Sequence, residues 1–229
     1  MALNITSLLA EMRADPESFL RHYWLQIAGG ATATGIVSGH ATDLATFQFD
    51  DKLKAGDGFT TGISGVFGLK KKRPWIKFTK RKIPADPNPD PNKGEFNAWY
   101  VPMQADDASG FGGGYQTLPP TGVDIMLTSQ LSGCTFAQGF SGGSTIVSHI
   151  QPYDSSSTAR THLHQTSTNL YGGTPNSLFE RENQSGAGSY GSLKNRATII
   201  GVRTGMVWEF YSQTFTAGGD AVIKNVKKL

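Results

Sequence analysis

The chain has 229 residues, of which 38% are hydrophobic and 17% charged, as in an ordinary soluble protein that folds as one domain. No apolar run reaches the length of a membrane span, and a single cysteine excludes an internal disulfide and a cysteine-rich metal site. The net charge of +3 is local, because the segment Lys70–Lys82 holds eight basic residues and no acid. The remainder is net negative, which argues against a nucleic-acid-binding surface over the whole protein.

The first predicted element is a helix that starts after Asp15. Asp15 is a favourable N-cap and Pro16 suits the first turn. Phe19, Tyr23 and Ile27 follow at helical spacing, and the Gly29-Gly30 pair should end the helix. We expect this amphipathic helix to pack on a sheet.

A strand is predicted at 46–49, and the basic segment Lys70–Lys82 follows it. Ile76 and Phe78 alternate with Trp75 and Lys77, the pattern of a strand with one buried face. The favoured interpretation is an edge strand or loop whose lysines discourage aggregation. The alternative is a patch that contacts an acidic partner, anionic lipid or nucleic acid.

A strong strand is predicted at 96–103, followed by a loop rich in glycine and proline. The segment Thr121-Gly122-Val123-Asp124 has the form of a helix start, and the apolar residues up to Leu131 keep helical spacing. Gly133 would then cap the helix. A helix C-terminus would raise the pKa of the Cys134 thiol, so activation would have to come from elsewhere.

The next element is a hairpin with strands at 135–138 and 144–149, joined by the glycine-rich segment 139–143. A turn centred between Ser141 and Gly142 would place Cys134 directly opposite His149 on one face. A neighbouring imidazole can take the proton of a thiol, and the thiolate then attacks a carbonyl carbon. The pair should lie at an open cleft.

Other residues near the cysteine could support that chemistry. Backbone N–H groups around Ser132 and Gly133 could form an oxyanion site, and the Thr128 hydroxyl could reach the pair. The alternative is that Cys134 is a small buried hydrophobe and that His149 merely ends a strand.

The rest of the chain offers little further chemistry. His162 and His164 share a strand face, but no third ligand is evident and no metal site is predicted. A hairpin is predicted from Ala197–Arg203 and Met206–Ser212 with a Thr204-Gly205 turn, and Lys224–Lys228 is expected to be a solvated end.

Four pieces of the sequence carry a resemblance to a known family. They are the segment Val123–Cys134 with its Leu-Ser-Gly-Cys end, His149 in a His-Ile-x-Pro context, the strand Trp99–Pro102, and the stretch from Tyr190 through the last hairpin. Together they resemble the catalytic domain shared by the Burkholderia lethal factor-like proteins and the cytotoxic necrotizing factors. The resemblance covers residues 96–213, and residues 1–95 have no counterpart in it.

The resemblance implies an α+β fold, a sandwich of mixed β-sheets flanked by helices and long loops. It implies a toxin-type deamidase that converts a glutamine of a host protein to glutamate without a cofactor. Cys134 would be the nucleophile, His149 the base and then the acid, and Thr128 a supporting residue. A main-chain carbonyl from the Trp99–Met103 strand would orient the histidine.

The family acts on Rho-family GTPases or on a translation-initiation helicase, and the sequence does not select between them. The start of the chain has no Sec signal, so we expect a protein that is made in the bacterial cytoplasm and delivered into the host cytosol. We also expect the protein to be a monomer. Two alternatives stay open. One is an amide or ester hydrolase or a transglutaminase that uses the same pair, and the other is a catalytically idle binding module whose basic segment Lys70–Lys82 contacts an acidic partner.

Overall fold

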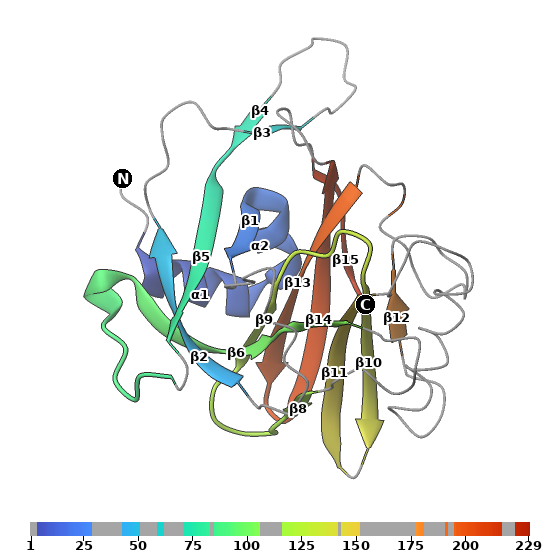
Figure 1. The fold of residues 1–229 in the computed structure, drawn as a ribbon. Coiled ribbons are helices and arrows are strands. Elements are labelled where there is room, and N and C mark those ends of the chain that lie inside the picture. Colours follow the sequence, from blue (N-terminus) through green and yellow to red (C-terminus); the bar gives the residue numbers. More distant parts are fainter. Residues whose placement is uncertain are drawn as a thin grey trace.

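The computed structural model describes residues 4–28, 43–50, 59–61, 71–82, 85–105, 116–141, 143–151, 177–180, 191, 195–216 and 223–229. This part of the chain is rich in β-strands and has two short α-helices near its start, so the helical share of the expected α+β fold is small (Figure 1). The helices are α1 (Ile5–Ala14) and α2 (Pro16–His22), with one 3-10 turn, η1 (Pro91–Lys93). The strands are β1 (Trp24–Ala28), β2 (Asp43–Asp50), β3 (Phe59–Thr61), β4 (Lys71–Arg73), β5 (Trp75–Lys82), β6 (Glu95–Val101), β7 (Met103–Ala105), β8 (Gln116–Leu118), β9 (Ile125–Thr128), β10 (Thr135–Ser141), β11 (Ser144–Gln151), β12 (Ser177–Phe179), β13 (Asn195–Thr204), β14 (Val207–Thr216) and β15 (Ile223–Lys228).

The larger sheet is mixed and has eight strands in the order β1-β5-β2-β6-β9-β13-β14-β15. One of its faces shares a hydrophobic core with α1 and α2, which lie behind it in Figure 1. Residues from the first 95 positions and from the last two hairpin strands pack in this same core. The segment that has no counterpart in the family resemblance is therefore built into the main sheet.

The larger sheet also curls, so that its β1 edge is bonded through side chains to strands near the other edge. The Gln213 side-chain oxygen accepts the Leu25 N–H at 3.0 Å, and the Thr198 hydroxyl donates to the Leu25 carbonyl at 3.0 Å. The Gln213 amide nitrogen donates to the carbonyls of Leu20 and Tyr23 at the end of α2. All of these bonds are buried, and they clamp α2 and β1 onto β13 and β14.

The smaller sheet has the order β12-β10-β11-β7, with β8 paired to β11. Its inner face and the other face of the larger sheet share a second core cluster. Phe136 of β10 and Phe210 of β14 meet there with ring centroids 5.5 Å apart. The two mixed sheets thus pack face to face, and the site discussed below lies in this layer.

The N-terminal prediction is correct at its start and wrong at its end. The Asp15 side chain accepts the Ser18 N–H and caps α2, as the sequence indicates. The helix ends at His22, however, and the following residues form β1, which pairs in parallel with β5. Leu25 and Ile27 are buried as strand residues, so tertiary packing overrides the helical spacing.

The edge-strand interpretation of the basic segment is wrong. β5 lies between β1 and β2, while β1 and the lysine-rich β15 form the two edges of the sheet. The alternation itself is correct, because Ile76 and Phe78 are fully buried and Lys77 is half-buried. The expected solvated C-terminal tail is also wrong, because it forms β15, whose Val226 is buried.

The helix predicted from Thr121 to Leu131 is wrong. Ile125–Thr128 form β9, and Leu131 makes an isolated bridge with Ala197. β9 lies between β6 and β13 in the middle of the larger sheet, and all four of its residues are fully buried. A strand that is covered on both faces reads as a continuous apolar run, which periodicity alone does not separate from a buried helix.

The last hairpin is confirmed, with its turn shifted by one residue. Thr204 pairs with Val207, so the turn residues are Gly205 and Met206. Gly205 has a φ of 61°, which a two-residue hairpin turn requires and glycine adopts at little cost.

Candidate functional site at the junction of the two sheets

The site forms where the chain passes from one sheet to the other at Pro102. β6 ends at Val101 in the larger sheet, and β7 begins at Met103 in the smaller one. Proline has no N–H to donate, so it suits the break between two ladders. In the larger sheet Val101 pairs with Thr128, and in the smaller one Met103 pairs with His149. The crossing therefore brings the ends of three strands together.

The hairpin β10–β11 is confirmed, but the predicted register is wrong by two residues. Ser141 pairs with Ser144 and Phe136 with His149, so the turn is centred between Gly142 and Gly143. Cys134, one residue before β10, is consequently diagonal to His149 rather than opposite it. Diagonal neighbours have backbone positions about 7–8 Å apart, within reach of long side chains. A shift by two keeps both residues on the same face.

His149 is held by a chain of two buried hydrogen bonds. The Thr128 hydroxyl donates to the Val101 carbonyl at 2.7 Å and lies 2.7 Å from Nδ1 of His149. A hydroxyl has one proton, and here the carbonyl receives it, so Thr128 accepts from the imidazole. Nδ1 therefore carries the ring proton, and Nε2 has the free lone pair.

Nε2 of His149 is buried and has no hydrogen-bond partner in the part of the chain that the structure describes. The ring is fully buried, and loss of hydration lowers the pKa of His149 to about 3. The imidazole is therefore neutral at pH 7. A thiolate beside it would favour the charged form again, because opposite charges stabilise one another in a site of low dielectric constant.

Cys134 is 2% exposed and belongs to the core cluster between the sheets. Its thiol donates to the thioether of Met103, with 3.6 Å between the two sulfur atoms. The expected open cleft is therefore not observed at the sulfur. A strand and a short loop precede Cys134 instead of a helix, so no helix C-terminus from this segment acts on the pKa of the thiol.

The proposed oxyanion residues lie in that short loop. Ser132 is exposed and Gly133 is half-buried, between the Leu131 bridge and the start of β10. Gly133 has a φ of 146°, a conformation that favours glycine. The two backbone bonds between Leu131 and Ala197, at 2.8 and 3.1 Å, fix one end of the loop.

Three groups at the site were not predicted individually. The Val101 carbonyl lies in the strand from which an orienting carbonyl was expected, but it acts through Thr128 and not on the imidazole itself. The Ser129 hydroxyl lies 3.4 Å from Nδ1 of His149, and Met103 contacts the thiol. A hydroxyl next to Thr128 and the residue after a proline are the only sequence signals for the last two.

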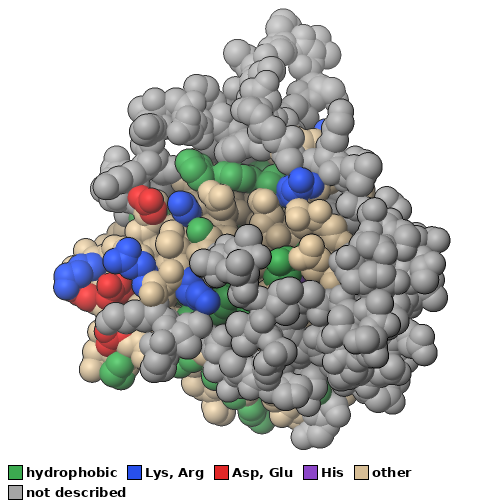
Figure 2. All heavy atoms as spheres, viewed as in Figure 1, with side chains coloured by type: hydrophobic (Ala, Val, Ile, Leu, Met, Phe, Trp, Pro, Cys, Tyr) green, Lys and Arg blue, Asp and Glu red, His purple; other side chains and the backbone are tan. Residues whose placement is uncertain are grey.

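Other features of the described residues do not add a cofactor or a second site. Within the ranges given above, no three His, Cys, Asp or Glu side chains are grouped to bind a metal ion, and His162 and His164 lie outside those ranges. No described helix could cross a membrane. A surface hollow of about 480 Å³ between α1 and the turn before β9 includes neither Cys134 nor His149 in its lining. On the face shown in Figure 2, basic and acidic side chains are intermixed at the left.

Comparisons with known proteins give a likeness to a solved structure and none at the level of sequence. No family model and no curated protein matches the sequence. Among solved structures, the chain is similar to the crystal structure of the C-terminal domain of CNFy from Yersinia pseudotuberculosis. The TM-score is 0.42 with 12% sequence identity, and the match covers 99% of each chain. At this level of likeness the function has to be argued from the residues of the site.

Proposed function

We propose that the protein is a cysteine amidohydrolase of the toxin type that converts a glutamine of a host protein to glutamate. Cys134 is the nucleophile, His149 the base and then the acid, and Thr128 positions the imidazole. The chain acts as one domain, with residues 1–95 completing the sheet on which the site is built. By analogy with the family that the sequence resembles, the substrate is a glutamine of a Rho-family GTPase or of a translation-initiation helicase.

The observation that carries the proposal is the fixed ring orientation of His149. Because the Thr128 hydroxyl accepts a hydrogen bond from Nδ1–H, the free lone pair of the imidazole is at Nε2. Nε2 is buried without a hydrogen-bond partner among the described residues, which costs free energy of folding. Phe136 pairs with His149, and Cys134 stands two residues before Phe136, so an alternation continued back from β10 puts Cys134 on the face of His149. A positioned base within reach of a thiol is the arrangement that acyl transfer needs.

The reaction follows from these roles. Nε2 takes the thiol proton as the sulfur attacks the carboxamide carbon, and the imidazolium gives that proton to the departing amine. Ammonia leaves and a thioester remains on Cys134. Water, activated by the same nitrogen, hydrolyses the thioester and releases a glutamate side chain and the free thiol. A transglutaminase would differ only in the acceptor, with a primary amine in place of water.

A second candidate function is supported by the burial of the thiol. A cysteine that is 2% exposed in an apolar cluster is also what a structural residue looks like. Under this alternative the protein is a binding module, and the basic segment Lys70–Lys82 contacts an acidic partner. Salt-sensitive binding together with a Cys134 thiol that does not react would support it.

The test is mass mapping of glutamines in host-cell proteins incubated with the wild-type protein and with Cys134→Ser. We expect specific glutamines to become glutamates only with the wild type. Equal conversion with Cys134→Ser would contradict the nucleophile assignment. Incorporation of an added primary amine would identify a transglutaminase.

A further inference from the structure

The thiol of Cys134 is covered by the side chain of Met103, which has about the length of a glutamine side chain. Met103 is half-buried, packs against the core cluster between the sheets and places its sulfur 3.6 Å from the Cys134 sulfur. It is also the register partner of His149 on the neighbouring strand β7. Met103 thus contacts the nucleophile and stands beside the base.

Methionine and glutamine side chains are both unbranched, have three rotatable bonds, and carry a hetero group at the δ position. The reacting carbon of a glutamine is Cδ, and the atom of Met103 that contacts the thiol is Sδ. Reacting atoms in a productive complex lie about 3–3.5 Å apart, close to the observed sulfur–sulfur distance. Asparagine would present its carboxamide carbon one bond too early.

We propose that Met103 is a resident stand-in for the substrate, occupying the position that a glutamine side chain takes when it reaches Cys134. This inference rests on the proposed function. A thioether is uncharged and a weak acceptor, so its contact with the sulfur stabilises the protonated thiol at rest. An incoming glutamine displaces a flexible side chain that changes rotamer readily.

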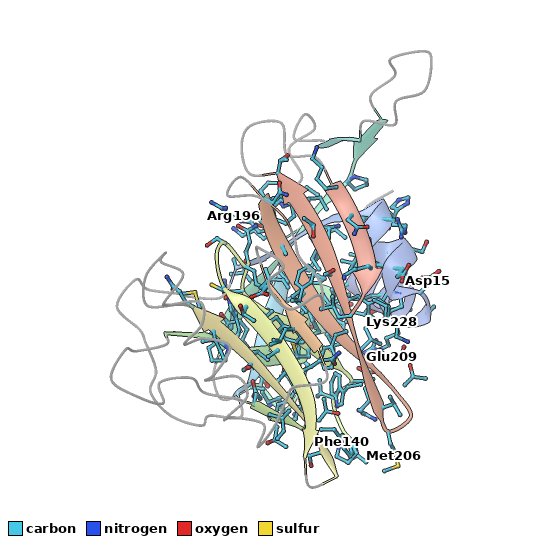
Figure 3. The ribbon with its side chains drawn as sticks, turned by 90° about the vertical axis from the view of Figure 1, so that its right-hand side faces the viewer. Asp15, Phe140, Arg196, Met206, Glu209 and Lys228 are labelled. Carbon is cyan, nitrogen blue, oxygen red and sulfur yellow. The ribbon has the colours of Figure 1, made fainter. Side chains whose placement is uncertain are left out.

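Access to the thiol is measured with iodoacetamide, a small primary carboxamide that alkylates the sulfur and releases iodide. Met103→Ala should raise the rate of Cys134 alkylation about tenfold at neutral pH. Met103→Leu keeps the volume of the cover but loses the thioether acceptor, so its alkylation rate should rise much less than that of Met103→Ala. Met206→Ala is the matched control, because Met206 is 71% exposed at the turn of β13–β14. Arg196 marks the opposite end of that hairpin, where Ala197 bridges Leu131, three residues before Cys134 (Figure 3).

A second variant, Met103→Gln, places a carboxamide carbon where Met103 has its Sδ atom. In Met103→Gln, the Cys134 sulfur should attack the new carboxamide carbon, release ammonia and, after hydrolysis by water, leave a carboxylate at position 103. Mass spectrometry of the peptide that contains position 103 detects the change. The double variant Met103→Gln/Cys134→Ala should keep its amide. This variant preserves the length of the side chain, so it serves also if Met103→Ala does not fold.

The outcomes separate this inference from the proposed function. Equal alkylation rates in folded Met103→Ala and wild type would overturn the stand-in. An unchanged amide in Met103→Gln would also overturn it if the wild type converts glutamines in other proteins. Faster alkylation of Met103→Ala without glutamine conversion anywhere would support Met103 as the cover and count against the deamidase.

Discussion

Two buried polar networks cross the interior of this protein, and they end differently. Each contains a threonine hydroxyl that donates to a main-chain carbonyl: Thr198 to Leu25, and Thr128 to Val101. In the first network, both polar atoms of the Gln213 side chain are bonded to backbone groups of α2, the turn after it and β1. In the second, the chain of bonds stops at Nε2 of His149, which has no partner among the described residues.

The difference separates a structural network from one that is reactive under the proposed function. A fully satisfied buried network stabilises and specifies a fold. An unsatisfied buried nitrogen costs stability, and sites that perform chemistry are one of the places where proteins carry such a cost. Among the described residues, Nε1 of Trp75 and Nε of Arg203 are also buried without a hydrogen-bond partner, but Nε2 of His149 is the one that the proposed function uses as a base. The first network holds the curled sheet together.

The largest expected effect comes from removing the unsatisfied nitrogen. His149→Asn keeps a donor toward Thr128 but has no base, so glutamine conversion should fall by about 10³-fold or more. His22→Asn is the control, because His22 is exposed at the end of α2 and should not affect the rate. Conversion is measured by mass mapping of the target glutamine. A rate of glutamine conversion near that of the wild type would contradict the assignment of His149 as the base.

A substitution in the Gln213 network should lower the stability of the protein without acting on the chemistry. Gln213→Leu leaves the Leu25 N–H without its acceptor and two carbonyls without their donor, which should lower the free energy of unfolding by about 3 kcal/mol. Gln48→Leu loses one exposed bond to the Lys93 carbonyl and should cost much less. Urea titration of both variants provides the measurement. Equal losses would show that the clamp is not what holds β1.

The two threonines offer a matched pair. Thr128→Val removes the acceptor that fixes the His149 ring, so the rate of glutamine conversion should fall between about tenfold and a hundredfold. Thr198→Val removes an equally buried hydroxyl from the other network and should change stability without changing the rate per folded molecule. Kinetics of both variants, normalised to folded protein, decide the matter. A slower Thr198→Val would mean that the networks are not separate.

The effect that develops most gradually is a dependence of stability on pH. Burial lowers the pKa of His149 to about 3, so the unfolded state binds a proton that the folded state does not over the range between about 6.5 and 3. Stability contributed by the neutral ring is present above pH ~6.5 and is lost as the pH falls. Relative to His149→Asn, the wild type should lose about 1.4 kcal/mol per pH unit within that range. Parallel curves for the two proteins, measured by urea titration from pH 8 to 4, would contradict the buried neutral imidazole.

The sequence indicated the hairpin, because alternation of apolar residues reports which face is buried. It could not fix the register. A shift of two residues leaves every side chain on its face, and the segment Gly139–Gly143 has several positions that suit a turn. The pairing of Ser141 with Ser144 depends on the strands on either side of the hairpin.

The rest of the site was hidden for other reasons. The Val101 carbonyl is a backbone group and leaves no mark on the side-chain pattern. Met103 contacts Cys134 only because the chain changes sheets at Pro102, a long-range event. The sequence placed Thr128 in a helix that the structure replaces with β9. The family resemblance around Cys134 nevertheless pointed to Thr128, whose hydroxyl lies 2.7 Å from Nδ1 of His149. Short buried segments are where tertiary packing decides between helix and strand.

The proposed function requires that Nε2 of His149 takes the proton of the Cys134 thiol. The most direct measurement is the rate of Cys134 alkylation by iodoacetamide across pH in the wild type and in His149→Asn. We predict that the wild type reacts about tenfold faster at pH 7 and that the difference vanishes well above the ordinary thiol pKa of roughly 8.5, where the thiol ionises without a base. Superimposable curves for the two proteins over the whole pH range would contradict the account.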